Sequence, residues 1–174
     1  MAFITQGSTF YSFADYDDVV AKDSRLFSAN EGLTQEVVEE SLIRSTTRIL
    51  DMLRSSGWWK SYYIRQSGST ADVVVGQSIS VPALDPFLIK ARQGDFTDLC
   101  VYHTLSEYLL AKVADFGNPD SAERQKLGFY DQKFRTLFDE LVASGDWYDF
   151  SNNGSIANSD IRSEEHTSEL QSRL

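Results

Sequence analysis

The stretch Leu33–Trp59, LTQEVVEESLIRSTTRILDMLRSSGWW, decides the fold class of this chain. Thr34 is a good N-cap, and glutamates follow it where the helix dipole favours negative charge. From there to Ser55, the side chains that suit a buried face recur at spacings of three and four. These are Val38, Leu42, Thr46, Ile49 and Leu53. The pattern predicts a long amphipathic helix.

Two later stretches carry the same period. The first begins at a cap at Asp95 or Thr97, and its face carries Val101, Leu105, Tyr108, Leu109, Val113 and Phe116. The second follows a capping-box pattern at Asp120 and Glu123, and its face carries Leu127, Tyr130, Phe134, Leu137, Phe138 and Leu141. Three long helices with short connections are most economically packed as a bundle. We therefore predict a mainly α fold.

The remaining segments are predicted from their local composition. Residues 1–14 read as an extended aromatic arm, and 15–145 as one helical-bundle domain that starts with a short helix around Asp15 to Lys22. Runs of β-branched residues bounded by Gly and Pro predict an insertion over 67–86, with a β-hairpin or long loop around 70–82. Residues 146–161 read as a C-terminal arm.

Aromatic and β-branched side chains in these segments are the interface candidates. They are Phe3, Phe10, Tyr11, Phe13, Trp58, Trp59, Val73, Val75, Ile79, Trp147 and Tyr148. Aromatics on an arm need an apolar surface to dock on, either the core of the same chain or a neighbouring subunit. The cluster around Trp58 is typical of a core plug or an interface anchor.

The composition excludes several classes of protein. A formal net charge of -10 argues against a protein that binds nucleic-acid backbone, which needs clustered Lys and Arg. Cys100 is the only cysteine, so a fold held by intrachain disulfides is excluded. The start lacks the pattern of a signal peptide, and no apolar run approaches the roughly 20 residues of a membrane span. We expect a soluble protein, made inside the cell, that does not bind membranes.

An enzyme needs converging reactive groups, and the sequence offers few. His103 lies on a helical face without a nameable partner, which is typical of a structural histidine. The acidic groups DYDD (15–18) and EVVEE (36–40) fall at predicted helix starts, where carboxylates are favoured electrostatically. No nucleophile elbow, phosphate-binding glycine loop or zinc-protease motif is present. We predict no catalytic residues and no enzyme activity.

The segment from 149 to 160 has the ligand spacing of a calcium loop. Asp149, Ser151, Asn153, the Ser155 carbonyl and Asp160 occupy its oxygen positions, and Gly154 stands at the sharp turn. Only two of these ligands carry charge, and aspartate at the last position is short, so a bound Ca²⁺ would be held weakly. The alternative is an Asn/Gly turn of the same composition without an ion.

The eleven residues Arg162–Ser172 match one translated frame of a common short-read sequencing adapter. We interpret 162–174 as a non-native tail and leave it out of the fold prediction. The native sequence is expected to continue differently after about Ile161.

The order of elements resembles a known family. FADYDDVVAKDSRLF (13–27), the opening stretch, FTDLCVYHTLSEYLLAKVADFG (96–117) and FYDQKFRTLFDELVASGDWYDF (129–150) are similar to the head-to-tail adaptor (connector, or head-completion) proteins of tailed bacteriophages. The resemblance lies in pattern and length and covers most of 13–150.

The resemblance implies a structural virion protein in the neck, assembled in the host cytoplasm. It implies a ring, commonly of twelve copies, between the portal protein and a tail or tail-completion protein. DNA would pass through the ring without specific binding, and no cofactor is expected. The rival reading is a calcium-binding regulatory or adhesion module that uses the loop at 149–160.

Overall fold

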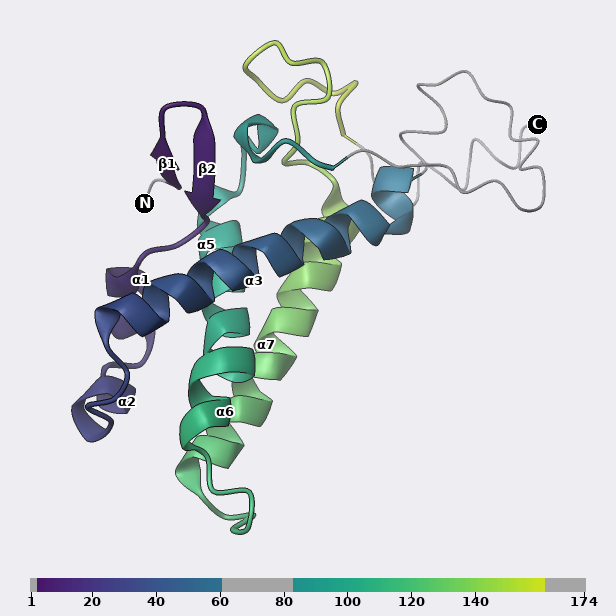
Figure 1. Ribbon diagram of the computed structural model, residues 1–174. Helices are drawn as coiled ribbons and strands as arrows, with labels where there is room; N and C mark the ends of the chain where they lie inside the picture. The colour runs from purple at the N-terminus through teal and green to yellow at the C-terminus, as the bar shows by residue number, and fades with distance from the viewer. Residues whose placement is uncertain (1–2, 61–82, 162–174) are drawn as a thin grey trace, which may run out of the picture. The chain divides into compact units, whose positions relative to one another are not determined.

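The computed structural model describes residues 3–60 and 83–161 (Figure 1). The described chain is mainly helical with a small two-stranded antiparallel sheet, so the predicted fold class is confirmed at this level. It divides into two compact units. Unit 1 contains Met1–Arg48 and Arg92–Asp139, and unit 2 contains Ile49–Ala91 and Glu140–Leu174. The predicted hairpin or loop around 70–82 lies outside the described residues.

Unit 1 begins with a hairpin rather than an unpaired arm. Strands β1 (Ile4–Gln6) and β2 (Thr9–Ser12) pair antiparallel, with Thr5 opposite Phe10. Gly7 has a φ of 59°, which glycine adopts without steric cost, and it opens the two-residue turn. Gly-Ser between two short runs of β-branched and aromatic residues is a hairpin signal.

Helix α1 (Tyr16–Lys22) confirms the predicted short helix, and Asp15 caps it. The Asp15 carboxylate accepts a hydrogen bond from the Asp18 amide, and the Asp18 carboxylate accepts one from the Asp15 amide. This reciprocal pair satisfies two amides at the helix start. A further short helix, α2 (Ser24–Ala29), follows at once.

Helix α3 (Gln35–Ser55) forms where the opening stretch predicts it. The Thr34 hydroxyl accepts a hydrogen bond from the Val37 amide, as an N-cap should. The whole predicted face is buried, with side chains at most 3% exposed: Val38, Leu42, Thr46, Ile49 and Leu53. The last two of these belong to unit 2.

The second long helical run changes its hydrogen-bonding pattern part-way along. Helix α5 (Gln93–His103) leads directly into a π-helical segment η2 (Thr104–Leu109) and then α6 (Leu110–Val113). Its N-cap is Arg92 in the left-handed conformation, φ 54°, and not Asp95 or Thr97 as predicted. The Asp95 carboxylate instead pairs with the Arg92 guanidinium at 2.7 Å.

The third run is α7 (Ala122–Ser144). Ser121 caps it in place of the predicted Asp120, because the Ser121 hydroxyl accepts from the Arg124 amide at 3.3 Å. Gly145, with a φ of 55°, follows its last residue and lets the chain turn away. Its first eighteen residues lie in unit 1 and the rest in unit 2.

Unit 2 joins the short 3-10 helix η1 (Pro86–Leu88) to the segment after α7. Ile89 and Tyr148 form an antiparallel bridge, and the Asp149 amide donates to the Leu88 carbonyl at 2.9 Å. The Trp147 carbonyl accepts from the amides of Lys90 and Ala91. These bonds fix the backbone that enters the predicted calcium loop.

Candidate functional site

The loop from 149 to 160 is built around two buried carboxylates. Asp149 is fully buried and Asp160 is 2% exposed. The Asp149 carboxylate accepts hydrogen bonds from the Gly154 amide at 2.7 Å and the Asn153 amide at 3.2 Å. Asn152 and Gly154, at φ 51° and 89°, wrap the backbone around it. The glycine stands at the position that the sequence predicted for the sharp turn.

Ser151 connects the two acids. Its hydroxyl lies 3.0 Å from an Asp160 oxygen and 3.4 Å from an Asp149 oxygen. Asp160 also accepts from the Ser151 and Ala157 amides, at 3.1 and 2.9 Å. The structure therefore brings three of the five predicted ligands together.

The other two predicted ligand residues contact each other, but at Ser155 through the amide and hydroxyl and not through the predicted carbonyl. The Asn153 side-chain oxygen accepts from both the amide and the hydroxyl of Ser155, each at 3.0 Å. Over residues 3–60 and 83–161, no group of three or more His, Cys, Asp or Glu side chains is placed to hold a metal ion. With its acids bonded to amides and a hydroxyl, the loop is a closed turn around two buried carboxylates.

The ionisation of Asp149 reflects this environment. Burial of the side chain acts to raise its pKa, but the hydrogen bonds from Gly154, Asn153 and Ser151 stabilise the charged form and outweigh burial. The pKa of Asp149 therefore lies below its ordinary value. The contribution of Asp149 to stability is present above the pKa of an unfolded aspartate, and it is lost as the pH falls through the folded value.

The aromatic candidates next to the loop form the centre of unit 2. Trp58, Trp59, Trp147 and Tyr148 are all at most 5% exposed. The rings of Trp58 and Trp147 lie 4.6 Å apart, and the Trp147 indole N–H donates to the Leu141 carbonyl at 2.7 Å. Within this chain these side chains act as a core plug, one of the two roles that the sequence left open. Val73, Val75 and Ile79 lie outside the described residues.

The aromatics of the N-terminal segment pack mainly on unit 1 itself. Phe13 is fully buried and lies edge-on to Phe3 and Phe10, with both ring centroids 5.1 Å away. Phe96 of α5 lies on it at 5.3 Å. Tyr11 differs, because its side chain is 40% exposed. Of the four candidates in this segment, Tyr11 presents the most side-chain surface.

A row of buried hydroxyls between α3 and α5 supplies the partner of His103 that sequence reasoning missed. The Ser45 hydroxyl lies 2.9 Å from His103 Nδ1 and accepts from the Thr104 hydroxyl at 2.8 Å. Ser45 is completely buried and His103 is 8% exposed. A nucleophile must reach its substrate, so this pair is structural rather than catalytic. The only indication in the sequence was the position of two hydroxyls. Thr46 lies on the predicted buried face of α3, and Ser45 is adjacent to it.

Cys100 lies beside the same row. Its thiol is 3.4 Å from the Thr46 hydroxyl and 3.6 Å from the Leu42 carbonyl. Burial raises the pKa of the thiol to about 11, so it stays protonated at neutral pH. Cys100 behaves as a small core residue.

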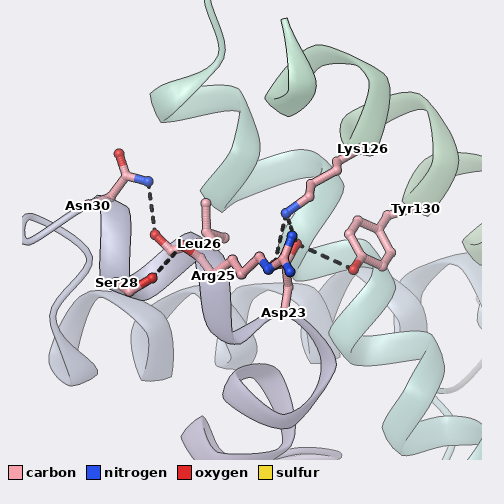
Figure 2. A network of polar contacts seen from close by, with 7 residues as sticks. All are labelled: Asp23, Arg25, Leu26, Ser28, Asn30, Lys126 and Tyr130. Atoms are coloured by element: carbon pink, nitrogen blue, oxygen red, sulfur yellow. Dashed lines mark hydrogen bonds and ion pairs between the residues drawn. The ribbon is translucent and has the colours of Figure 1, made fainter.

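A second polar group joins the α1–α2 corner to α7 (Figure 2). The buried Asp23 carboxylate accepts from Lys126 Nζ at 2.8 and 2.9 Å and from the Tyr130 hydroxyl at 3.4 Å. Burial, followed by the charge of Asp23, raises the pKa of Tyr130 to about 12, so the phenol remains a donor. With every charge partnered, this group stabilises unit 1 and leaves no reactive atom.

Acidification is expected to destabilise unit 1 through His103. Burial lowers the pKa of its imidazole, so below about pH 6.5 the unfolded chain takes up the proton first. Stability should therefore fall as the pH drops from 7 through the folded pKa and should be insensitive to His103 above 7. The measurement is urea unfolding between pH 4.5 and 7.5.

In the variant His103→Asn, which retains a hydrogen-bonding side chain, the part of this pH dependence due to His103 should disappear. The variant Phe116→Ala, at a ring that is 60% exposed, serves as the control and should keep the full dependence. An unchanged profile in His103→Asn would show that the pH dependence arises elsewhere.

No protein-family model, curated protein or solved structure was found to match this chain. In the part of the chain that the structure describes, no helix is both long and apolar enough to span a membrane.

Proposed function

We propose that this protein is a head-to-tail adaptor of a tailed bacteriophage. The observation that carries the proposal is the order of elements. An N-terminal paired segment and α1 precede three long helical runs, α3, α5–η2–α6 and α7, and a segment that turns away after Gly145. From α1 onward, this is the order on which the sequence resemblance rests.

In this role the chain assembles as a ring, commonly of twelve copies, between the portal and a tail or tail-completion protein. The formal charge of -10 suits a channel wall that must let DNA pass without binding it. The exposed side of the hairpin, including Tyr11, is a candidate contact with a neighbouring subunit, and the segment after Gly145 is a candidate arm onto the portal. The neck of the virion is the corresponding location.

The test is the mass of the full chain in solution, alone and mixed with a portal ring. The expected result is a closed oligomer of defined number, formed alone or on the portal, and seen by native mass spectrometry and light scattering. It should form equally with calcium or with chelator. A strict monomer that never associates with portal or tail protein would refute the adaptor proposal.

A weak calcium site is the second candidate function, favoured by the two buried carboxylates that share the Ser151 hydroxyl. A cation between them would replace the Ser151 donor and recruit water to reach six or more oxygen ligands. With so few charged ligands, the affinity falls in the range of about 0.1–1 mM.

If calcium binds, the melting temperature of the full chain should rise by a few degrees at about 10 mM Ca²⁺ relative to chelator. Matched Mg²⁺ should do less, because it demands a tighter octahedral site. The variant Asp160→Asn keeps the shape of the side chain and should remove the calcium response. An unchanged midpoint in wild type would exclude the site.

A further inference from the structure

Unit 1 has a groove between the hairpin, the start of α1 and α3. Its volume is about 490 Å³, and it is lined by apolar side chains with two acids among them. The large apolar residues are Ile4, Tyr11, Leu42 and Ile43, and the acids are Asp15 and Glu39. We call these six residues the acidic groove; Gln6, Ser12 and Ala14 complete its lining. Ile4, Tyr11 and Ile43 are 38%, 40% and 43% exposed, so much of their apolar surface faces solvent.

The two carboxylates of the acidic groove have no cation beside them in the described chain. Asp15 accepts from the Asp18 amide, and Glu39 accepts from the Gln35 side-chain amide at 2.7 Å. Both residues are exposed. An apolar floor with unneutralised acids fits an apolar side chain that is accompanied by a positive charge.

Unit 1 carries such a surface on α7 and the turn before it. Phe129 is 53% exposed, and Lys133 Nζ lies over its ring at 5.5 Å from the centroid. Phe116 is 60% exposed, and the Arg124 guanidinium donates to its carbonyl at 3.3 Å. We call these four residues the basic patch.

The charge of this part of α7 is opposite to that of the chain as a whole. Residues 122–135 contain four basic and two acidic side chains, in a chain of net charge -10. Lys126 pairs with Asp23, and Arg135 pairs with Asp131. Arg124 and Lys133 pair with no carboxylate in the described chain, so they are available to a partner.

We propose that the basic patch of one copy docks in the acidic groove of a second copy. Phe129 would enter the apolar groove, and Lys133 and Arg124 would meet Glu39 and Asp15. The two surfaces share no residue, so the contact is heterologous: each copy offers one of each, and repetition gives a ring if the rotation closes. This inference names the contact between neighbouring copies in the proposed ring. That repetition of the contact gives a closed ring rests on the proposed function.

The test mixes two variants of the full chain, each with one surface broken. Ile43→Lys places a charge among the apolar side chains of the groove. Phe129→Glu replaces the exposed ring with a negative charge, which Asp15 and Glu39 would repel. Both sites are exposed, and circular dichroism checks that each variant folds. Each variant alone should associate at least tenfold more weakly than wild type. The mixture should form dimers, because one intact pair of surfaces remains.

A charge exchange tests the electrostatic part. Lys133→Glu and Glu39→Lys should each weaken association, and the double variant should recover it. Glu40→Lys makes the same change one residue away, outside the groove, and is the matched control, expected to associate like wild type. Loss of association in the control alone, or no recovery in the double variant, contradicts the assigned charge pairing.

The outcomes separate this inference from the function proposal. If wild type forms rings and both broken variants do too, the contact is refuted and the adaptor proposal stands. If wild type forms only dimers or open chains that both variants dissolve, the contact stands and the adaptor proposal fails. A mixture that stays monomeric refutes the heterologous contact.

Discussion

Replacing Trp147 with alanine is expected to lower the free energy of unfolding by about 3–5 kcal/mol. Trp147 is fully buried, and it is among the largest side chains in that state. It packs on Trp58 and Tyr148, with ring centroids 4.6 and 5.9 Å away. Removing it leaves a cavity and takes one donor from the Leu141 carbonyl, which still accepts from the Gly145 amide and the Ser144 hydroxyl. The measurement is urea unfolding at neutral pH.

The variant Trp147→Phe separates packing from hydrogen bonding. It keeps a ring in the cluster but removes the indole N–H that donates to Leu141, so it should cost clearly less than alanine. Phe116→Ala, at a ring that is 60% exposed, is the surface control and should change stability by about 0.5 kcal/mol or less. A loss below about 1 kcal/mol for Trp147→Ala would contradict the cluster as the centre of unit 2.

Phe13→Ala is expected to have a similar effect on unit 1, about 3–5 kcal/mol. The ring is fully buried against Phe3, Phe10 and Phe96. Its backbone is held as well, since its amide donates to the Thr46 hydroxyl at 3.2 Å and its carbonyl accepts from Thr97 at 2.8 Å. Phe13 therefore connects the hairpin to α5 through its ring and to α3 through its backbone amide.

The control for Phe13 is Tyr11→Ala, two residues earlier on β2. Tyr11 is 40% exposed, so its removal should cost about 1 kcal/mol or less. Near-ultraviolet circular dichroism together with urea unfolding would report both changes. Equal losses at the two positions would show that the hairpin is held by its own pairing rather than by Phe13.

The long helices could be predicted because their signal is periodic and local. The apolar residues of α3 recur at spacings of three and four, and each residue of the face predicted from them is buried. The cap of α1 was also local, since Asp15 and Asp18 bond only to each other's backbone. The hairpin had a local signal too, in Gly7-Ser8, but aromatic density favoured an arm.

The features that escaped prediction depend on contacts far apart in the chain or on backbone conformations that residue types do not specify. Arg92 adopts a left-handed conformation that is usual for glycine and not for arginine. Residue type alone therefore favoured Asp95 as the N-cap. The π-helical segment at 104–109 has no residue signature. Ser45 and His103 are 58 residues apart, and nothing in either neighbourhood indicates the other.

The spacing of the acids in the candidate loop could be predicted, but not whether their oxygens bind a cation or accept hydrogen bonds from the chain. The positions of Asp149, Ser151 and Asp160 followed from the pattern, and the structure brings them together. Which donors satisfy the two carboxylates depends on how tightly the backbone closes. Hydrogen bonds from amides compete with a cation for the same oxygens, and residue spacing does not decide that competition.

The row of hydroxyls in unit 1 has a consequence for how α3 can slide against α5. Ser12, Thr46 and Cys100 meet at one level, and Ser45, Thr104 and His103 meet at the next. A shift of α3 by four residues in one direction would put Ile49 and Leu50 in the places of Ser45 and Thr46, and in the other direction Leu42 in the place of Thr46. The buried partners facing an apolar replacement would lose a hydrogen bond, at about 1–3 kcal/mol apiece. Apolar side chains alone would tolerate such a shift far better. The polar pairs therefore fix the register in which the two helices pack.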